Sequence, residues 1–447
     1  MNPENDIRSV FSHALRRVDP YEMIRSSMSV EADSLVISHE GGTIREDLNA
    51  YRDIVVLGIG KASSKMGMAM EEVLGERISQ GVVVTKYGHA EPLKRIRVMQ
   101  AGHPIPDENS VAGAGALFDL ASGADEKTLI LNLVSGGGSA LFSLPPEGIS
   151  LEDKQVTTKV LLESGADIRE INSVRKHLSR VKGGRFARAA FPARTINIIL
   201  SDVVGDRLDT IASGIAVPDD TTYAQALDIV SKYHIRNRLP ESVVLYLESG
   251  KKGDVPDTPK QGDPVFARVL NVLLGNNLAA CSAARDHGTS LGYRAVLVTS
   301  MLTGEAREAA KFFAAMARDI RRGTADFARP ALIVAGGETT VTIRGTGKGG
   351  RNQEMALSFL NEFYENQAGT ENIYFLSAGT DGTDGPTDAA GAIIGPGLPA
   401  ETARLGLNPG AYLENNDSYH FFQKAGGLFI TGPTNTNVCD IQLMIVM

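Results

Sequence analysis

Glycines beside basic residues are the feature of this sequence that points most directly to chemistry, because together they can bind an anion. The longest such stretch is GGETTVTIRGTGKGGRNQE, residues 336–354, in which Lys348 and Arg351 flank Gly349 and Gly350. Glycines let backbone N–H groups approach an anion, and a helix N-terminus adds favourable partial charge. We therefore predict a phosphate or carboxylate site here, with Arg351 opening a helix.

A second glycine turn, GIGK, follows an apolar run and contains Gly58, Gly60 and Lys61. Its spacing is not that of a P-loop, and Ser63 stands where a dinucleotide fingerprint has its third glycine. A plain tight turn explains the glycines about as well as a binding site does. A lysine at a helix N-terminus is normally unfavourable, however, and a bound anion would reverse that penalty. Lys61 is therefore a candidate anion ligand.

A third glycine segment, SGGGSAL, also follows an apolar run, and it starts with Ser135, Gly136, Gly137, Gly138 and Ser139. Three consecutive glycines are costly in chain entropy and are hard to justify by packing. The GxSxG pattern of a nucleophile elbow is absent. We interpret the segment as a nest of backbone donors for an anion, with two hydroxyls beside it, and not as a serine nucleophile.

Carboxylates follow other predicted strands, where side chains face the ligand crevice of a parallel sheet. Asp202 comes after the strand that ends at Leu200, and it either serves the site or caps a turn. Asp381 and Asp384 lie in GTDGTDGPTD, whose spacing does not fit an EF-hand. Such aspartates more often cap turns than bind metal. With a phosphate present, they are candidates for Mg²⁺, which one or two carboxylates can hold.

The basic segment INSVRKHLSRVKGG places Arg175 beside Lys176 and His177 in a predicted helix. A charged helix face in solvent is the simpler interpretation of this spacing. Arg175 is the residue of this helix that we consider as an anion ligand.

Strands alternate with helices along the whole chain, which predicts an α/β fold with a parallel sheet covered on both faces. The expected strands are 53–57, 81–85, 95–99, 128–134, 195–200, 269–274, 294–299, 331–335, 339–344 and 373–378. The expected helices are 6–18, 21–28, 68–75, one that Asn109 or Ser110 caps and that runs through Leu120, 151–164, 168–180, 276–291, 304–321 and 351–365.

The hydrophilic run SGKKGDVPDTPKQGDP, residues 249–264, interrupts this alternation and predicts a domain boundary. The 447 residues would then form an N-terminal domain, residues 1–250, and a C-terminal α/β domain, residues 265–447.

Composition and net charge limit the kinds of molecule that this chain is expected to bind. A net charge of −8 argues against nucleic-acid binding by bulk electrostatics. Cys281 and Cys439 are the only cysteines, so neither a disulfide framework nor a zinc site is expected, and a reducing cytosol fits. No apolar stretch approaches the roughly 20 residues of a membrane helix, and no signal peptide is visible. We expect a cytoplasmic protein without membrane or nucleic-acid partners. The sequence leaves the oligomeric state open, a homo-oligomer included.

The motifs taken together resemble those of the class II glycerate kinases with a C-terminal MOFRL domain. Nine of them occur in order: GIGKAS, GHPIPDE, SGGGSAL, INSVRKHLSRVKGG, SDVVGD, GGETTVTIRGTGKGGRNQE, SAGTDGTDGPTDAAGA, NNDSY and GPTNTN. The resemblance implies a three-layer Rossmann-like N-terminal domain and a smaller C-terminal α/β domain with a mixed sheet and a MOFRL region at about 330–445. It also implies a cleft between the domains for ATP, Mg²⁺ and glycerate.

The activity that the resemblance implies is ATP-dependent phosphorylation of D-glycerate at the 2-hydroxyl, giving 2-phosphoglycerate and ADP. Matching the motifs makes Lys61, Asp202 and Arg351 the expected catalytic residues. Asp202 would accept the hydroxyl proton or position the metal, and Lys61 and Arg351 would neutralise charge. Backbone amides of residues 135–138 and 345–350 would bind anionic oxygens.

Three departures from the family pattern leave acceptor specificity open, namely SGIAVPDDTTY at residues 213–223, Arg207 and Asn435. The rival hypotheses are an NAD(P)-dependent hydroxypyruvate reductase and a non-catalytic module that binds small anions. The missing dinucleotide fingerprint gives the reductase no support.

Overall fold

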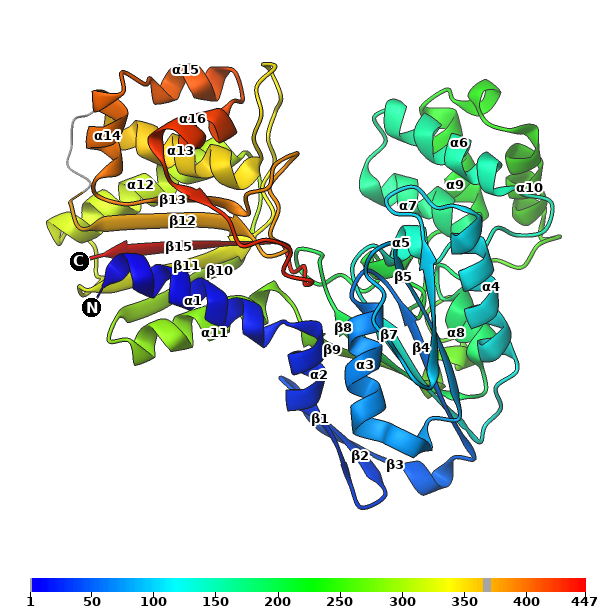
Figure 1. Ribbon diagram of the computed structural model, residues 1–447. Helices are drawn as coiled ribbons and strands as arrows, with labels where there is room; N and C mark the ends of the chain where they lie inside the picture. The colour runs from blue at the N-terminus through cyan, green and yellow to red at the C-terminus, as the bar shows by residue number, and fades with distance from the viewer. Residues whose placement is uncertain (1, 365–370) are drawn as a thin grey trace. The chain divides into compact units, whose positions relative to one another are not determined.

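Six apolar strands form a parallel sheet in the computed structural model, which describes residues 2–364 and 371–447 (Figure 1). The strands are β4 (Asp53–Ile59), β5 (Gln80–Lys86), β6 (Ile96–Ala101), β7 (Thr128–Val134), β8 (Arg194–Leu200) and β9 (Val269–Gly275). Their order in the sheet is β6-β5-β4-β7-β8-β9, and the pairs from β6 to β8 are parallel. This is the order of Rossmann-type folds, in which ligands bind where the strand order reverses, here between β4 and β7.

Helices pack on this sheet and also form a separate helical layer. α3 packs against β4 and β5, α4 packs against β5 and β6, and α8 packs against β8. Helices α6, α7, α9 and α10 share an apolar core of their own, which includes Leu161, Val174, Ala226 and Val243. The bounds are α2 (Pro20–Ser27), α3 (Ser63–Leu74), α4 (Glu108–Ser122), α5 (Gly138–Leu141), α6 (Leu151–Glu163), α7 (Ile168–His177), α8 (Arg185–Ala190), α9 (Tyr223–Lys232) and α10 (Glu241–Lys252).

The second sheet is mixed and has the order β10-β11-β15-β12-β13-β14. Within this sheet, β10 and β11 are the strands that pair in parallel among the described residues, and β15 runs antiparallel between β11 and β12. The strands are β10 (Arg294–Leu302), β11 (Ala331–Gly337), β12 (Ile373–Gly379), β13 (Gly391–Ile394), β14 (Leu428–Phe429) and β15 (Asp440–Val446).

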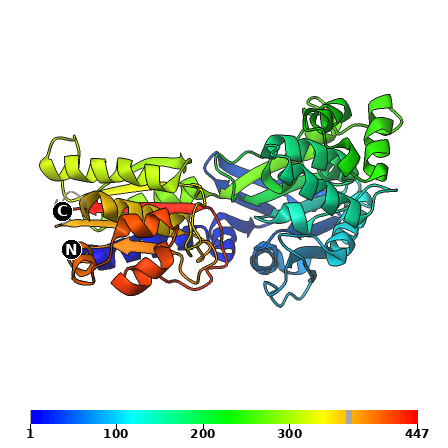
Figure 2. The same ribbon diagram turned by 90° about the horizontal axis from the view of Figure 1, so that it is seen from above.

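Helices cover both faces of the mixed sheet (Figures 1 and 2). α1 and α11 lie on one face, and α12 and α13 lie on the other, where Phe359 stacks on Phe375 with ring centroids 4.3 Å apart. The bounds are α1 (Pro3–Arg17), α11 (Asn277–Ser290), α12 (Ala306–Arg322), α13 (Arg351–Tyr364), α14 (Leu398–Arg404), α15 (Pro409–Glu414) and α16 (Ser418–Ala425). Among the described residues, none of the helices has the length and apolar character that crossing a membrane requires.

The chain divides into two compact units, one around each sheet. One unit comprises the segment up to Asp19, the segment Asp202–Gly205 and the chain from Gly275 onward; the other comprises Pro20–Ser201 and Asp206–Leu274. The boundary differs from the expected one at residues 249–264. Helix α1 belongs with the mixed sheet because it buries its apolar face there, and β9 extends the parallel sheet.

The α/β class and most predicted elements are confirmed, and three differences are informative. The expected strand 339–344 is absent: Thr340 makes an isolated bridge to Glu305, and the Thr342 amide bonds to the Glu305 side chain. Helix α4 is capped by Asp107, which accepts from the Ser110 amide, and not by Asn109 or Ser110. An antiparallel sheet of β1 (Met28–Glu31), β2 (Ser34–His39) and β3 (Gly42–Asp47) was not predicted. Residue 365 of the predicted helix 351–365 lies outside the described residues.

Candidate functional site

The turns after β4 and β7 meet where the strand order of the parallel sheet reverses. The Lys61 amide donates to the Gly136 carbonyl oxygen at 2.9 Å, and the Ser135 amide donates to the Ile59 carbonyl oxygen at 2.9 Å. The Ser135 hydroxyl oxygen accepts from the Ala62 amide at 3.0 Å. Gly60 has a φ of +118°, and a Cβ there would lie 2.4 Å from the Ser135 carbonyl oxygen. The two predicted anion turns, GIGK and SGGGS, therefore form one structural unit.

Not every glycine of these two motifs lies in a turn. Gly58 is inside β4, where a Cβ would lie 2.7 Å from a methyl group of Val83, so its role is close packing of the strand. Gly138 begins α5, and a Cβ on it would lie 3.0 Å from the Ala212 Cβ. Only Gly60, Gly136 and Gly137 form the meeting point of the turns.

Cationic and titratable nitrogens gather around Gly137. A Cβ on Gly137 would lie 2.9 Å from Cδ2 of His103 and 3.3 Å from Cε of Lys61. Burial, followed by the charges of Lys61, Lys86 and His89, lowers the pKa of His103 to about 4. Burial and the same two lysines also lower the pKa of His89. A bound phosphate or carboxylate would relieve this mutual repulsion. Sequence reasoning missed His103, although it lies in the GHPIPDE motif.

Ser139, the second serine of SGGGS, contacts a segment whose backbone is strained. Ser139 Oγ lies 2.8 Å from Ser213 Oγ, and the buried Lys182 ammonium donates to the Ser139 carbonyl oxygen. Ala212 and Ser213 have φ values of +49° and +62°, a conformation that costs non-glycine residues free energy and is found preferentially at functional sites. The Ser139 hydroxyl thus has a partner within the chain.

The basic helix α7 is not the solvated charged face that its spacing favoured. Lys176 and His177 are buried, and Arg175 lines a cavity of about 600 Å³ together with Lys154 and Lys182. Burial lowers the pKa of Arg175. The structure thus brings Ser139 and Arg175, two predicted site residues, to the wall of one cavity.

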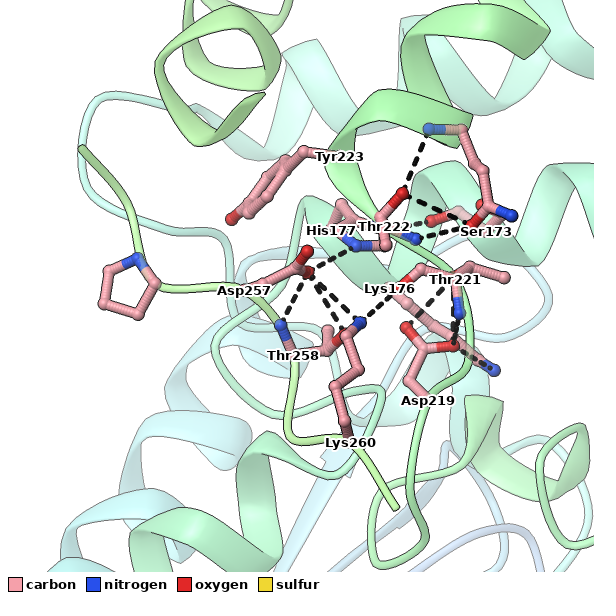
Figure 3. Close-up of polar contacts among 12 residues, drawn as sticks. Ser173, Lys176, His177, Asp219, Thr221, Thr222, Tyr223, Asp257, Thr258 and Lys260 are labelled. Carbon is pink, nitrogen blue, oxygen red and sulfur yellow. Dashed lines mark hydrogen bonds and ion pairs between the residues drawn. The ribbon is translucent and has the colours of Figure 1, made fainter. Parts of the chain in front are cut away.

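Polar contacts beneath α7 fix the direction of this helix (Figure 3). Lys176 and Asp219, which are only 5% and 1% exposed, form an ion pair of 3.2 Å. The two ring nitrogens of His177 face the Ser173 carbonyl oxygen at 2.7 Å and the Asp257 carboxylate at 2.9 Å. Although burial opposes it, hydrogen bonding from His177 and the Thr258 amide holds the pKa of Asp257 well below its usual range. These contacts tie α7 to the loops that contain Asp219 and Asp257.

The glycine loop at residues 345–350 differs from the predicted anion nest, because its first amides already have partners. Asn416 Oδ1 accepts from the Gly345 amide at 3.0 Å, Asn415 Oδ1 accepts from the Thr346 amide at 3.1 Å, and Asp417 Oδ1 accepts from the Lys348 amide at 2.9 Å. These acceptors belong to the NNDSY motif.

Close approach of the chain explains the glycines of this loop. A Cβ on Gly345 would lie 2.4 Å from the Asn415 carbonyl oxygen, and one on Gly347 would lie 2.4 Å from the Asp417 Cβ. A Cβ on Gly349 would likewise collide with the Ser418 side chain, and one on Gly350 would collide with the Asp384 side chain. The Lys348 ammonium lies 4.4 Å from the centroid of the Tyr419 ring, so it takes part in a cation–π contact.

Arg351 and Asp202 come together in a second group of charges, in the unit of the mixed sheet. The Arg351 guanidinium makes two hydrogen bonds to Asp440, at 2.6 and 2.9 Å, and an ion pair of 2.8 Å with Glu338. Burial, followed by the repulsive charges of Asp440 and Asp202, raises the pKa of Glu338 against the opposing effect of Arg351. Cys439 Sγ lies 3.2 Å from the Asp202 carbonyl oxygen.

Glu338 and Asp440 were not found from the sequence. Asp440 opens β15, a strand that was not predicted, and Glu338 follows the two glycines that end β11. The signal available for Asp440 was its place directly before a mostly apolar run, at 441–446, that was left unassigned.

Asp384, a predicted metal candidate, caps the start of α13. Its two carboxylate oxygens accept from the Asn352 and Gln353 amides, at 3.0 and 2.8 Å, at the start of α13. Burial raises the pKa of Asp384 to about 6. Asp381 accepts from the Thr383 amide within its own turn. Within residues 2–364 and 371–447, no group of three or more His, Cys, Asp or Glu side chains is placed to hold a metal ion.

Comparison with known proteins covers nearly the whole chain. Residues 6–248 match the family model described as a domain of unknown function (DUF4147), and residues 331–440 match the model of the MOFRL family. The chain is 43% identical to D-glycerate 2-kinase of Thermotoga maritima over 96% of its own length and 100% of the relative's. It is 40% identical to a putative hydroxypyruvate reductase of Agrobacterium vitis over 88% of its own length and 87% of the relative's.

A solved structure agrees with this relationship. The crystal structure of glycerate kinase from Thermotoga maritima superposes with a TM-score of 0.87 at 41% identity, covering 98% of each chain.

Replacing Gly60 should disrupt the meeting point of the two turns. We expect Gly60→Ala to lower the free energy of unfolding by about 3 kcal/mol, because a Cβ is strained at this φ and collides with the Ser135 carbonyl oxygen. Gly115→Ala is the control: in α4, nothing lies within 4 Å of its Cβ, and a gain of about 0.5–1 kcal/mol is expected. Urea denaturation measures both, and equal effects would contradict the requirement for glycine at position 60.

Removing the charge of Asp219 should leave Lys176 buried and unpaired. Asp219→Asn is therefore expected to cost about 3 kcal/mol of unfolding free energy. Asp220→Asn, at the exposed neighbouring position, is expected to change it by less than about 0.5 kcal/mol. The comparison uses denaturation midpoints of the two variants, and a neutral Asp219→Asn would show that the ion pair does not stabilise α7.

Proposed function

The chain belongs to the glycerate 2-kinase family that carries a MOFRL region, and we propose that it transfers the γ-phosphoryl group of ATP to the 2-hydroxyl of D-glycerate. The products would be 2-phosphoglycerate and ADP. The observation that carries the proposal is the approach of Lys61 and His103 to Gly137, at the point where the strand order of the parallel sheet reverses, with the charge of Lys86 also acting on His103.

The proposed reaction is an in-line displacement at the γ-phosphorus. The 2-hydroxyl oxygen of glycerate forms a bond to phosphorus, the bond to the bridging oxygen breaks, and ADP leaves with that electron pair. Asp202 accepts the hydroxyl proton or positions the metal. Positive charge beside the transferring group lowers the barrier most where it is fixed in advance. Lys61 supplies this charge. The hydrogen bond from its backbone amide to the Gly136 carbonyl oxygen fixes its backbone.

Arg351 has a different proposed role from the one that its sequence motif suggested. Its guanidinium is already paired with Asp440 and Glu338, which supports positioning of these carboxylates over neutralisation of substrate charge.

ATP is the phosphoryl donor that the kinase relatives imply, and Mg²⁺ is its usual partner. Asp384 does not fit as a magnesium ligand, because both of its oxygens accept from helix amides. Asp202 and Glu338, whose charges repel each other, fit better as its ligands. When bound, Mg²⁺ would neutralise phosphate charge. We also propose a cytoplasmic location, in keeping with two buried free cysteines.

The name of the Agrobacterium relative keeps hydroxypyruvate reduction as a second candidate function. Against it, the turn after β4 has Ser63 in place of the third fingerprint glycine, and the Ser63 hydroxyl donates to the Gly60 carbonyl oxygen in the turn and to the Val84 carbonyl oxygen of β5. A reductase would oxidise NADH or NADPH with hydroxypyruvate and would need no ATP.

Phosphorus NMR of the reaction mixture tests the proposed function. Wild-type protein with ATP, Mg²⁺ and D-glycerate should give 2-phosphoglycerate, whose coupling pattern distinguishes it from the 3-phosphate. Lys61→Met should lower kcat/KM by about 10²- to 10³-fold, because it removes fixed charge beside the transferring group. Lys127→Met, at an exposed position before β7, is the control and should have wild-type rates.

Two outcomes would contradict the proposal. Nicotinamide oxidation without phosphoester formation would favour the reductase. Near-normal turnover of a folded Lys61→Met variant would remove Lys61 from the mechanism.

A further inference from the structure

A cavity of about 600 Å³ opens in the unit of the parallel sheet, between α6, α7 and the loop that contains Pro104. Its size is within the usual range for sites that bind ligands of drug or nucleotide size. Lys154 of α6, Arg175 of α7 and Lys182 line one part of it, and Ser139 and Ser143 contribute hydroxyl groups.

Lys154 and Lys182, two buried cations of this cavity, have no carboxylate partner in the described part of the chain, whereas Glu163, which also lines it, pairs with Lys159 and Arg238. Lys154 is 8% exposed, and its buried Nζ has no hydrogen-bond partner among the described residues. Lys182 is 1% exposed, and its partners within the described residues are neutral oxygens, those of Ser139 and Ser213. Buried charges are normally paired, because desolvation of an unpaired ion costs several kcal/mol. An unpaired set in a cavity indicates an anionic ligand.

Apolar side chains border the same cavity and are unusually exposed. Ile105 is 69% exposed, Leu162 is 62% exposed and Val156 is 37% exposed, and all three line the cavity. The ligand should therefore combine several negative charges with a flat apolar group. Glycerate has one carboxylate and three carbons, so it matches neither the number of cations nor the apolar border.

We infer that this cavity holds the nucleoside triphosphate, with its phosphates against Lys154, Arg175 and Lys182 and its base against Ile105, Val156 and Leu162. The inference rests on the kinase activity proposed above, and it adds a location for the donor. The cavity adjoins the reversal point of the sheet, because Ser139 is two residues after Gly137 and Pro104 directly follows His103.

Titration of ATP by calorimetry, without glycerate, tests this location. Lys154→Met should weaken ATP binding by about 10- to 100-fold, the usual effect of losing a charge-assisted contact. The KM for glycerate should stay unchanged. Lys252→Met, on the exposed end of α10, serves as the control and should bind ATP as the wild type does.

Stability separates a ligand contact from a structural role. Lys154→Met removes an unpaired buried cation, so its urea midpoint should equal or exceed that of the wild type. A structural lysine would give the opposite sign. Arg175→Gln provides a second test in the same titration, because Arg175 also has no hydrogen bond or ion pair among the described residues.

Proton uptake gives a third readout. Burial, followed by the charge of Arg175, lowers the pKa of Lys154 to about 7, so at pH 8 its amine is mostly neutral in the free protein. Lys182, Lys159 and Glu163 are the other charged groups that line the cavity. Phosphate charge should raise this pKa again, and binding should take up a proton from the buffer. Calorimetry in two buffers should show Lys154→Met taking up fewer protons, by at most about one.

The outcomes distinguish this inference from the proposed function. If the wild type forms 2-phosphoglycerate but Lys154→Met and Arg175→Gln keep full ATP affinity, the location is wrong and the function stands. A variant that raises only the KM for glycerate would also overturn the location. If ATP binding depends on Lys154 but no phosphoglycerate forms, the function is wrong and the site stands.

Discussion

The contact between the turn after β4 and the turn after β7 is the constraint on which the rest of the candidate site depends. It is formed by backbone groups, the Lys61 amide and the Gly136 carbonyl, and it needs a glycine at position 60 because a Cβ would collide with Ser135. The strand order of the parallel sheet brings these two turns together at its reversal point. Once they meet, Lys61 and His103 lie against Gly137, and the chain continues into Ser139 at the wall of the cationic cavity.

The two groups of charged residues differ in how their charge is balanced. In the unit of the mixed sheet, Arg351 is paired with Asp440 and Glu338, so its charge is satisfied within the protein. In the unit of the parallel sheet, Lys154 and Lys182 have no carboxylate partner among the described residues, and burial lowers the pKa of both. A fold that keeps such groups in a cavity gives up stability, and binding of an anion would return it. This contrast is the physical basis for assigning the phosphates to the parallel-sheet unit.

Much of the fold could be predicted because many strands are mostly apolar runs, as at 128–134, and because glycine turns follow several of them. The role of the 345–350 loop could not be predicted. A glycine-rich loop whose amides bind an anion has the same composition as one whose amides donate to the NNDSY segment. The burial of Lys176 and His177 was equally hidden, because their partners Asp219 and Asp257 are 43 and 80 residues away in sequence. Strand β15 was visible as the apolar run 441–446 and was overlooked.

Hydrogen exchange of the backbone amides with and without ATP tests the central claim, which is that the anion site lies at the reversal point of the parallel sheet and not in the 345–350 loop. We expect ATP to slow exchange in peptides that cover residues 102–106 and 135–141. Exchange should stay unchanged at residues 344–348, whose amides are already bonded to Asn415, Asn416 and Asp417. Protection confined to residues 344–350 would contradict this claim.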